Sequence, residues 1–454
     1  MKKTFTFLMT AALCAASTVS ALAQSANTTN AATNYTTTQW EHYAADNFAG
    51  GTGTADDPYL IATPEQFMKL AVEIENLGAV DDNWDGDYTK GKYFKQTADL
   101  VFNEGILSKV GWADGDASSI NNASLRTFNG IGYKAGDVDY QRFAGTYDGA
   151  GHAIIGLYNN NAKNAGTAVF NFTEGATIKN LVVKDAYISA NANVGLIVGS
   201  ANAGSLIINC QSNGIIYCGG SYHAGIVGAL SESKMVNCYT DAMVWAKNQT
   251  GGLCGRLMKN SYAGNSYFNG WIGGVYSNLG KFKYWGAVSP EIGLSEDVTT
   301  APDPADETKT ITICEHPSKA ENCFWTDTCS VRHKDVKAEA YNDAANCKYG
   351  VVENCKAFAV SDAQKAVDEL NKNAKEINGA CAWEVGKDGM PALRFDTTTD
   401  GIYNVKTTQQ LAAEQNVYTL EGVLVKKAQK GFNPLFGLEK GVYVVNGKKC
   451  VVEK

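Results

Sequence analysis

The chain has 454 residues, 44% of them hydrophobic, and a formal net charge of −8 at pH 7. An acidic chain without a basic stripe lacks the phosphate-neutralising surface of nucleic-acid-binding proteins, so that class is excluded. Its twelve cysteines and five histidines match no zinc spacing well, and we expect neither a metal nor a cofactor.

The first residues predict an export signal. Two lysines precede an apolar run over residues 5–19, and Ala21-Leu22-Ala23 fits the cleavage rule. We expect removal of residues 1–23 and a location outside the cell or on its outer surface, the periplasm being less favoured. Residues 24–48 are predicted to be a flexible segment. No later run is long enough and apolar enough to span a bilayer.

A helix is predicted next, over residues 64–77. Thr63-Pro64-Glu65-Gln66 is a capping box with proline at the first helical position. Four apolar side chains then share one face: Phe67, Leu70, Ala71 and Ile74. Such a face suits a helix that covers the open end of a β-structure.

A repeat of about 28 residues follows. Its landmark asparagines, separated by steps of 29, 28 and 28 residues, are Asn180, Asn209, Asn237 and Asn265. Short β-branched runs between them favour strands over helices. Repeats of this length built from short strands predict a parallel β-helix, in which each residue stacks on its counterpart one coil away. The asparagines then form a ladder of side-chain amides at a turn.

Glycine-bracketed words recur in the same register: "VGLIVG", "AGIVG" and "GGLCG". We interpret them as buried strands flanked by glycines at sharp turns or close backbone contacts. The glycines are Gly195, Gly199, Gly225, Gly228, Gly252 and Gly255.

The positions after each asparagine form columns. Seven residues on stand Tyr187, Ile216, Val244 and Ile272, and nine residues on stand Ser189, Cys218, Ala246 and Gly274. We assign both columns to the core. Strand alternation then turns the aromatic residues of neighbouring columns outward. They form a candidate sugar-binding platform of Tyr217, Trp245, Tyr239 and Tyr267. The alternative is that they pack beneath loops.

Cys210 and Cys238 share one column a coil apart, within reach of a disulfide. Leu181 occupies the same column, which favours free, core-type thiols there. Eleven cysteines remain after cleavage of the signal, so at least one thiol stays free unless chains are cross-linked.

The rest of the chain departs from the repeat. The 28-residue period fails over residues 275–320, which are predicted to be an irregular insertion. Its acidic run, residues 295–310, is predicted to be a loop or a short disordered stretch. A second helix is predicted over residues 361–374, with Ser361 as N-cap, near the other end of the solenoid. After a linker at 396–402, residues 403–454 form a small β module in which Asn446-Gly447 predicts a hairpin.

The glycine words, together with "GTGTADDPYLIATPEQFMKLA" at residue 51 and "WEVGKDGMPALRF" at residue 383, resemble GLUG-motif surface proteins of Bacteroidetes-type bacteria. The resemblance spans residues 51–395, and the solenoid domain is predicted over residues 49–395. It implies an all-β, right-handed parallel β-helix on the cell surface. The C-terminal tail resembles the sorting domains of a dedicated secretion system, although it is shorter, and a plain terminal module is the alternative.

Three functions are compatible with this pattern. The favoured one is a non-enzymatic, monomeric, adhesin-like protein that binds glycans or host or matrix surfaces. The alternatives are a polysaccharide-degrading lyase or hydrolase and a passive structural spacer. The sequence has no H-E-x-x-H motif, and the repeat has no acidic column. Asp148 and His152 form the nearest approach to a polar dyad, which we assign to a structural turn, so no catalytic residue is predicted.

Overall fold

A computed structural model describes eleven segments of the chain: residues 35–77, 88–106, 125–132, 141–161, 166–274, 282–332, 336–395, 417–419, 424–426, 441–445 and 448–452. The predicted signal, residues 1–23, lies outside these segments.

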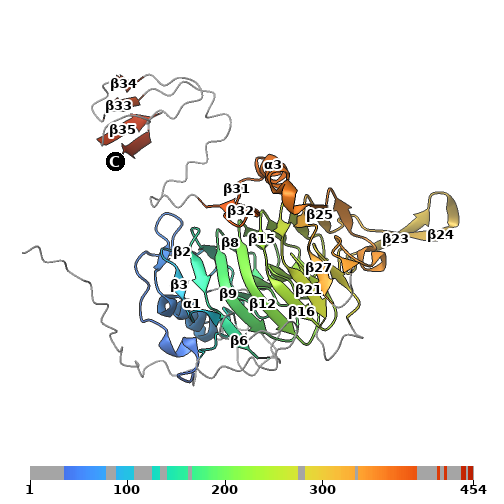
Figure 1. The fold of residues 1–454 in the computed structure, drawn as a ribbon, viewed down its shortest axis with the longest axis horizontal. Coiled ribbons are helices and arrows are strands. Elements are labelled where there is room, and N and C mark those ends of the chain that lie inside the picture. The colour runs from blue at the N-terminus through green and yellow to red at the C-terminus, as the bar shows by residue number, and fades with distance from the viewer. Residues whose placement is uncertain are drawn as a thin grey trace, which may run out of the picture.

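The body is the predicted parallel β-solenoid, seen side-on in Figure 1. One wall is a nine-stranded parallel sheet of β1 (Tyr59–Ile61), β2 (Tyr93–Gln96), β4 (Thr146–Asp148), β8 (Thr177–Lys179), β11 (Leu206–Ile208), β14 (Lys234–Val236), β19 (Tyr262–Gly264), β25 (Lys319–Glu321) and β29 (Val351–Glu353). A second, four-stranded wall contains β7 (Phe170–Glu174), β10 (Val198–Asn202), β13 (Val227–Ser231) and β18 (Leu257–Met258).

The third wall is a thirteen-stranded sheet. Its strands are β3 (Leu100–Val101), β5 (Ala153–Ile155), β6 (Tyr158–Asn160), β9 (Val182–Ser189), β12 (Gln211–Cys218), β15 (Tyr239–Thr240), β16 (Met243–Ala246), β20 (Tyr267–Phe268), β21 (Trp271–Gly274), β26 (Phe324–Thr326), β27 (Ser330–Arg332), β28 (Val336–Lys337) and β30 (Lys356–Phe358). Two shorter strands, β17 (Thr250–Gly251) and β22 (Trp285–Gly286), pair in parallel at a corner.

The N-terminal helix α1 (Pro64–Leu77) has the predicted bounds and lies at the N-terminal end of the solenoid. The backbone N–H of Gln66 donates to the Thr63 hydroxyl at 3.3 Å, and the Gln66 side chain accepts from Ala62 N–H at 2.8 Å. The predicted apolar face is buried, and the Phe67 ring contacts four aromatic rings of the first coils. The capping signals in the sequence and the burial of the apolar face therefore both favour a helix here.

The solenoid begins earlier than the predicted boundary at residue 49. The 3-10 helix η1 (Trp40–Tyr43) packs against α1, and Trp40 is buried beside Phe102. The part of the predicted flexible segment that the structure describes, residues 35–48, is thus attached to the body. Burial of a large indole ring removes much apolar surface from water, so Trp40 anchors the segment that carries it.

The glycine words are corners rather than strands. In the first of them the bend covers residues 196–197, and strand β10 starts at Val198, so only the last two residues of this word lie in a strand. The predicted shared register of the three words is confirmed, because Val198 pairs with Val227 and Val227 with Cys254. A Cβ atom on Gly195 would lie 2.3 Å from the Val198 carbonyl oxygen, so the backbone itself occupies the space of a side chain.

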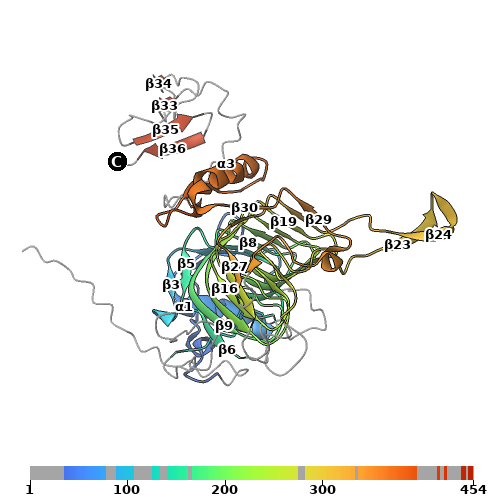
Figure 2. The same cartoon turned by 45° about the vertical axis from the view of Figure 1, so that its right-hand side comes forward.

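The prediction that residues 275–320 form an irregular insertion was partly wrong, because this range contains another coil of the solenoid. The amide of Gly252 donates to Gly286 O, Leu253 N to Ala287 O, and Cys254 N to Val288 O. Residues 285–288 thus repeat the glycine word one coil later. The hairpin β23 (Thr299–Asp303) and β24 (Asp306–Ile313) follows and projects from the body in Figures 1 and 2. We call residues 299–313 the arm.

The second predicted helix, α3 (Ala363–Ala374), starts after two 3-10 turns, η3 (Ala344–Cys347) and η4 (Val360–Asp362). Its N-cap residue is Asp362, not Ser361. It packs with the antiparallel hairpin β31 (Ala382–Val385) and β32 (Pro391–Arg394) on the side of the solenoid, whereas a position near its end was predicted. We call residues 363–394 the cover.

In the C-terminal module the described strands form one antiparallel sheet: β33 (Val417–Thr419), β34 (Leu424–Lys426), β35 (Gly441–Val445) and β36 (Lys448–Val452). Val445 pairs with Lys448, which confirms the predicted hairpin, although its turn residues 446–447 lie outside the described segments.

Candidate functional site

The asparagine ladder is confirmed, and three of its four repeat members are buried: Asn209, Asn237 and Asn265. All four repeat asparagines have φ between +46° and +55°, a left-handed turn that asparagine tolerates better than most residues. Their side-chain amides bond from coil to coil: Asn209 donates to Asn180 at 2.9 Å, Asn237 to Asn209 at 2.7 Å, and Asn265 to Asn237 at 2.8 Å. The ladder continues on a later coil from Asn354 to Asn322 at 2.6 Å.

The cover closes over this ladder and supplies further hydrogen-bond partners to it. The Asn209 amide donates to Gly379 O at 2.8 Å, and Cys381 N–H donates back to Asn209 Oδ1 at 2.9 Å. The Trp383 indole donates to Asn237 Oδ1 at 2.6 Å. A buried polar row of this kind is stable only when its groups are paired, so the cover and the ladder require each other.

Two members of the predicted platform lie beneath the cover. Tyr239 is 3% exposed and Tyr267 is fully buried, with their rings stacked at 6.4 Å and 12°. Val367, Leu370 and Trp383 of the cover belong to the same apolar cluster. The prediction that these tyrosines are exposed was wrong, because a distant segment of the chain buries the outward column.

The other two members lie in a second external cluster. Trp245 is fully buried and Tyr217 is half-buried. They belong to an apolar group on the outside of the thirteen-stranded sheet that contains Ile106, Leu125, Tyr158, Tyr187 and Ile215. The platform of stacked exposed aromatics is therefore absent from this part of the chain, and packing beneath covering segments is the arrangement found.

One column was misassigned by a single residue. Ile215 pairs with Tyr187, so the register shifts between the coils, and Ile188 rather than Tyr187 stacks on Ile216 in the core. The extra residue is accommodated near Asp185, whose φ is +51°. This bulge explains why the first step is 29 residues instead of 28. By the same shift Ala190 replaces Ser189 in the inner column.

Asp148 and His152 have separate structural partners. The Asp148 carboxylate accepts from Asn180 Nδ2 at 2.9 Å and from Ala150 N–H at 2.8 Å, so it starts the ladder. His152 Nδ1 lies 3.5 Å from Asp99 Oδ1 instead. This agrees with the assignment to a structural turn.

Two buried ionisable groups have large pKa shifts. Burial raises the pKa of Glu41 to about 7 even though Asn129 N–H donates to it at 2.7 Å. Burial lowers the pKa of His223 to about 4, and this ring sits in a column between Val194 and Thr250. Both are enclosed by the solenoid, so they bear on stability rather than on a reacting ligand.

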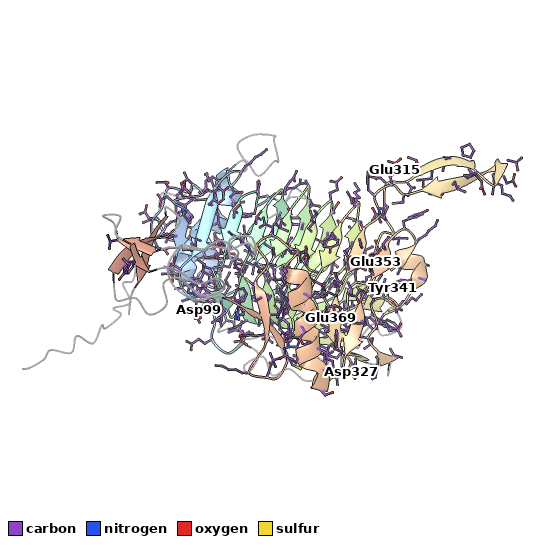
Figure 3. The ribbon with its side chains drawn as sticks, turned by 90° about the horizontal axis from the view of Figure 1, so that it is seen from above. Asp99, Glu315, Asp327, Tyr341, Glu353 and Glu369 are labelled. Carbon is purple, nitrogen blue, oxygen red and sulfur yellow. The ribbon has the colours of Figure 1, made fainter. Side chains whose placement is uncertain are left out.

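The arm projects from the body and carries exposed apolar side chains. Val298 beside it and Ile313 within it are 41% and 37% exposed. Ser318 N–H donates to the Glu296 carboxylate at 3.3 Å, so the two ends of the arm lie side by side. Figure 3 shows Glu315 where the arm leaves the body.

A cavity of about 490 Å³ opens near the last coil. Its lining combines aromatic, charged and thiol side chains: Trp325, Glu339, Tyr341, Asn342, Cys355 and Lys356. Figure 3 labels Tyr341, one of the lining residues. Among the described residues no group of three or more His, Cys, Asp or Glu is arranged to hold a metal ion. No described helix is long and apolar enough to cross a membrane.

No known family model matches the chain, so the GLUG and sorting-domain resemblances stay predictions. A stretch of 218 residues is 28% identical to halomucin of Haloquadratum walsbyi and covers 46% of this chain. The chain spans only 2% of the length of that relative. A crystal structure from Bacteroides ovatus, described as a "putative immunoglobulin A1 protease", has a TM-score of 0.41 and 18% identity over 77% of this chain and 95% of its own. A second structure, named IgA1 protease, has a TM-score of 0.32 and 17% identity over 60% of this chain and 19% of its own.

Proposed function

We propose that the chain is a non-enzymatic, adhesin-like surface protein whose solenoid presents the arm to a partner protein. The observation that supports this proposal is the arm itself, a two-stranded sheet that projects from the body and pairs with no other described strand. Export and surface display are supported by the signal-like N-terminus and by the similarity to halomucin.

A protein partner fits the arm better than a glycan does. Sugar rings are recognised by stacking on flat aromatic faces, and residues 294–318 contain no aromatic side chain apart from His316. Unpaired strand edges instead accept an extended peptide by main-chain hydrogen bonding. Residues 295–315 carry six acidic residues and one lysine, so an extended segment with basic side chains is the complementary partner.

The test uses immobilised matrix proteins, fibronectin and collagen, and compares the full chain with a variant in which a short Gly-Ser turn replaces residues 298–314. Since residues 296 and 318 are adjacent, the body should keep its melting temperature. We expect the variant to bind at least ten times more weakly. Ile313→Ser should weaken binding, whereas the control Val360→Ser, at an exposed β-branched residue outside the arm, should not.

The enzymatic alternative has its own test. The full chain is incubated with a panel of acidic and neutral polysaccharides, and reducing ends and unsaturated products are measured. Robust turnover would contradict the proposal, as would matrix binding that is indifferent to loss of the arm. Binding on a glycan array that survives loss of the arm would favour a sugar-binding surface elsewhere, for which Trp271, 37% exposed, is the first residue to replace.

A further inference from the structure

We propose that Cys355 is a reactive thiol and that Cys323, stacked on it in the next coil, is its resolving partner, so that low-molecular-weight disulfides convert the pair into a disulfide across the last coils. This inference is independent of the arm. It rests on the stacking of the two cysteines and on the cavity that leads to one of them.

The stacking follows from the strand register. Glu321 pairs with Glu353 on one side of the turn, and Phe324 pairs with Lys356 on the other. Cys323 and Cys355 therefore occupy equivalent positions one coil apart, where adjacent strands are separated by roughly 4.8 Å. That separation of Cα atoms lies within the range of disulfides. The Cys323 thiol donates to Glu321 O at 3.6 Å and the Cys355 thiol to Glu353 O at 3.3 Å, so the two side chains have the same orientation.

The two thiols differ in access. Cys323 is fully buried, and Cys355 is partly exposed and lines the 490 Å³ cavity with Tyr341 and Lys356. The cavity gives a small disulfide reagent room to reach Cys355 but not Cys323. This is the arrangement of an attacking thiol with a resolving thiol behind it.

The chemical state of the pair agrees with these roles. A hydrogen bond from Cys323 lowers the pKa of the Cys355 thiol, and the same bond, together with burial, raises the pKa of Cys323. Burial raises the pKa of two other partly exposed cysteines, Cys314 and Cys347. Since the thiolate is the nucleophile, Cys355 is favoured for the first attack.

The reaction balances with a disulfide as the oxidant. The Cys355 thiolate attacks one sulfur of R–S–S–R, the S–S bond breaks, and one R–S⁻ leaves with the electron pair. Cys323 loses its proton and attacks the Cys355 sulfur, and the second R–S⁻ leaves. The two protein protons end on the two leaving thiolates, so one dithiol and one disulfide give one protein disulfide and two R–SH.

The chain contains a matched internal control. Cys210 and Cys238 stack in the same column, with Gln211 paired to Tyr239 beside them, but both are fully buried. If stacking alone decided reactivity, the two pairs would oxidise together. If access through the cavity decides it, only the Cys323–Cys355 pair reacts quickly.

The experiment treats the full-length folded protein with oxidised glutathione, blocks residual thiols with iodoacetamide, and maps the peptides by mass spectrometry. We expect a Cys323–Cys355 bridge to form at least ten times faster than any Cys210–Cys238 bridge. Cys323→Ser should stop the reaction with one glutathionyl group on Cys355, and Cys355→Ser should abolish both products. Serine is compatible with this column, because Ser266 occupies it on the coil between the two pairs.

Either of two results would overturn the inference. One is that Cys355 stays fully alkylatable by iodoacetamide after prolonged exposure to oxidised glutathione. The other is that the two pairs oxidise at equal rates. Circular dichroism of each variant, compared with the unmodified chain, shows that lost reactivity does not reflect lost folding.

Discussion

At the scale of single residues, glycine is used where one coil touches the next. A Cβ atom on Gly228 would lie 2.4 Å from Asn193 C and 2.5 Å from Val194 N, both of them backbone atoms. Backbone atoms of a neighbouring coil cannot move aside as a flexible side chain can. The close spacing of the coils therefore requires glycine at position 228. A left-handed backbone is not the reason, because Gly228 does not have a positive φ.

We expect Gly228→Ala to lower the free energy of unfolding by about 3 kcal/mol, the upper part of the range for overpacked sites. The matched control is Gly219→Ala, where an added Cβ meets nothing within 4 Å, and there the change should stay within about 0.5 kcal/mol. Urea unfolding followed by circular dichroism measures both. Equal effects at the two positions would contradict the contact argument.

Glu41 predicts a pH dependence of stability. Its pKa is about 7 in the folded chain against 4.5 for the free side chain, because burial disfavours the charged form. The folded state then binds more protons than the unfolded state between these values, so stability should fall as pH rises from about 4.5 to about 7. The loss has an upper limit of roughly 3 kcal/mol.

Glu41→Gln should remove this loss while still accepting the hydrogen bond from Asn129 N–H. Melting temperatures measured between pH 4.5 and 8 should converge at low pH and favour the variant at high pH. His223 acts in the opposite direction, since its lowered pKa favours stability that is lost as pH falls from about 6.5 towards 4. A wild-type profile identical to that of Glu41→Gln would contradict the assignment to Glu41.

At the scale of elements, the repeat could be predicted from the sequence, but the segments that pack over its outer face could not. Spacing and side-chain type identify the ladder from Asn180 to Asn265, because each coil repeats the same local contacts. The extra residue near Asp185 breaks that regularity and shifts the assignment of Tyr187. Which outward aromatic residues are buried depends on packing between segments far apart in the chain, as between Tyr267 and the cover, and periodicity carries no information about it.

The cover should behave as an element that the solenoid needs. The side chain of Leu370, on α3, is fully buried in the cluster that contains Tyr239 and Tyr267. Lys372, on the same helix, is exposed. Leu370→Ala should destabilise the cover by about 2–5 kcal/mol, while Lys372→Ala should change little.

Hydrogen exchange at β15 and β20 tests this locally, because loosening of the cover exposes the strands that carry Tyr239 and Tyr267. We expect faster exchange there in Leu370→Ala than in Lys372→Ala. Unchanged protection of both strands would show that the cover is not coupled to the sheet beneath it.

At the scale of the whole molecule, the described solenoid has two different ends and at least two covered sides. Helix α1 lies at the N-terminal end. The cover buries one outward column of side chains, and the cluster around Trp245 buries another. The arm and the cavity belong to the later coils. Contact with other molecules is therefore expected at the later coils rather than along the repeat. The conspicuous aromatic residues of the repeat serve its own packing.

The same organisation predicts that the C-terminal module is thermodynamically separate from the solenoid. In a solenoid each coil is stabilised by its neighbours, so a segment that pairs with no coil adds little to its stability. Among the described strands, β33 to β36 pair only with one another. A variant lacking residues 396–454 should keep the melting temperature of the solenoid within about 2 °C, the shift that a loss of about 1 kcal/mol causes in a large domain. Differential scanning calorimetry measures it. A drop of about 10 °C, or loss of the Trp383 burial signal in fluorescence, would mean that the module supports the cover and that the two fold as one unit.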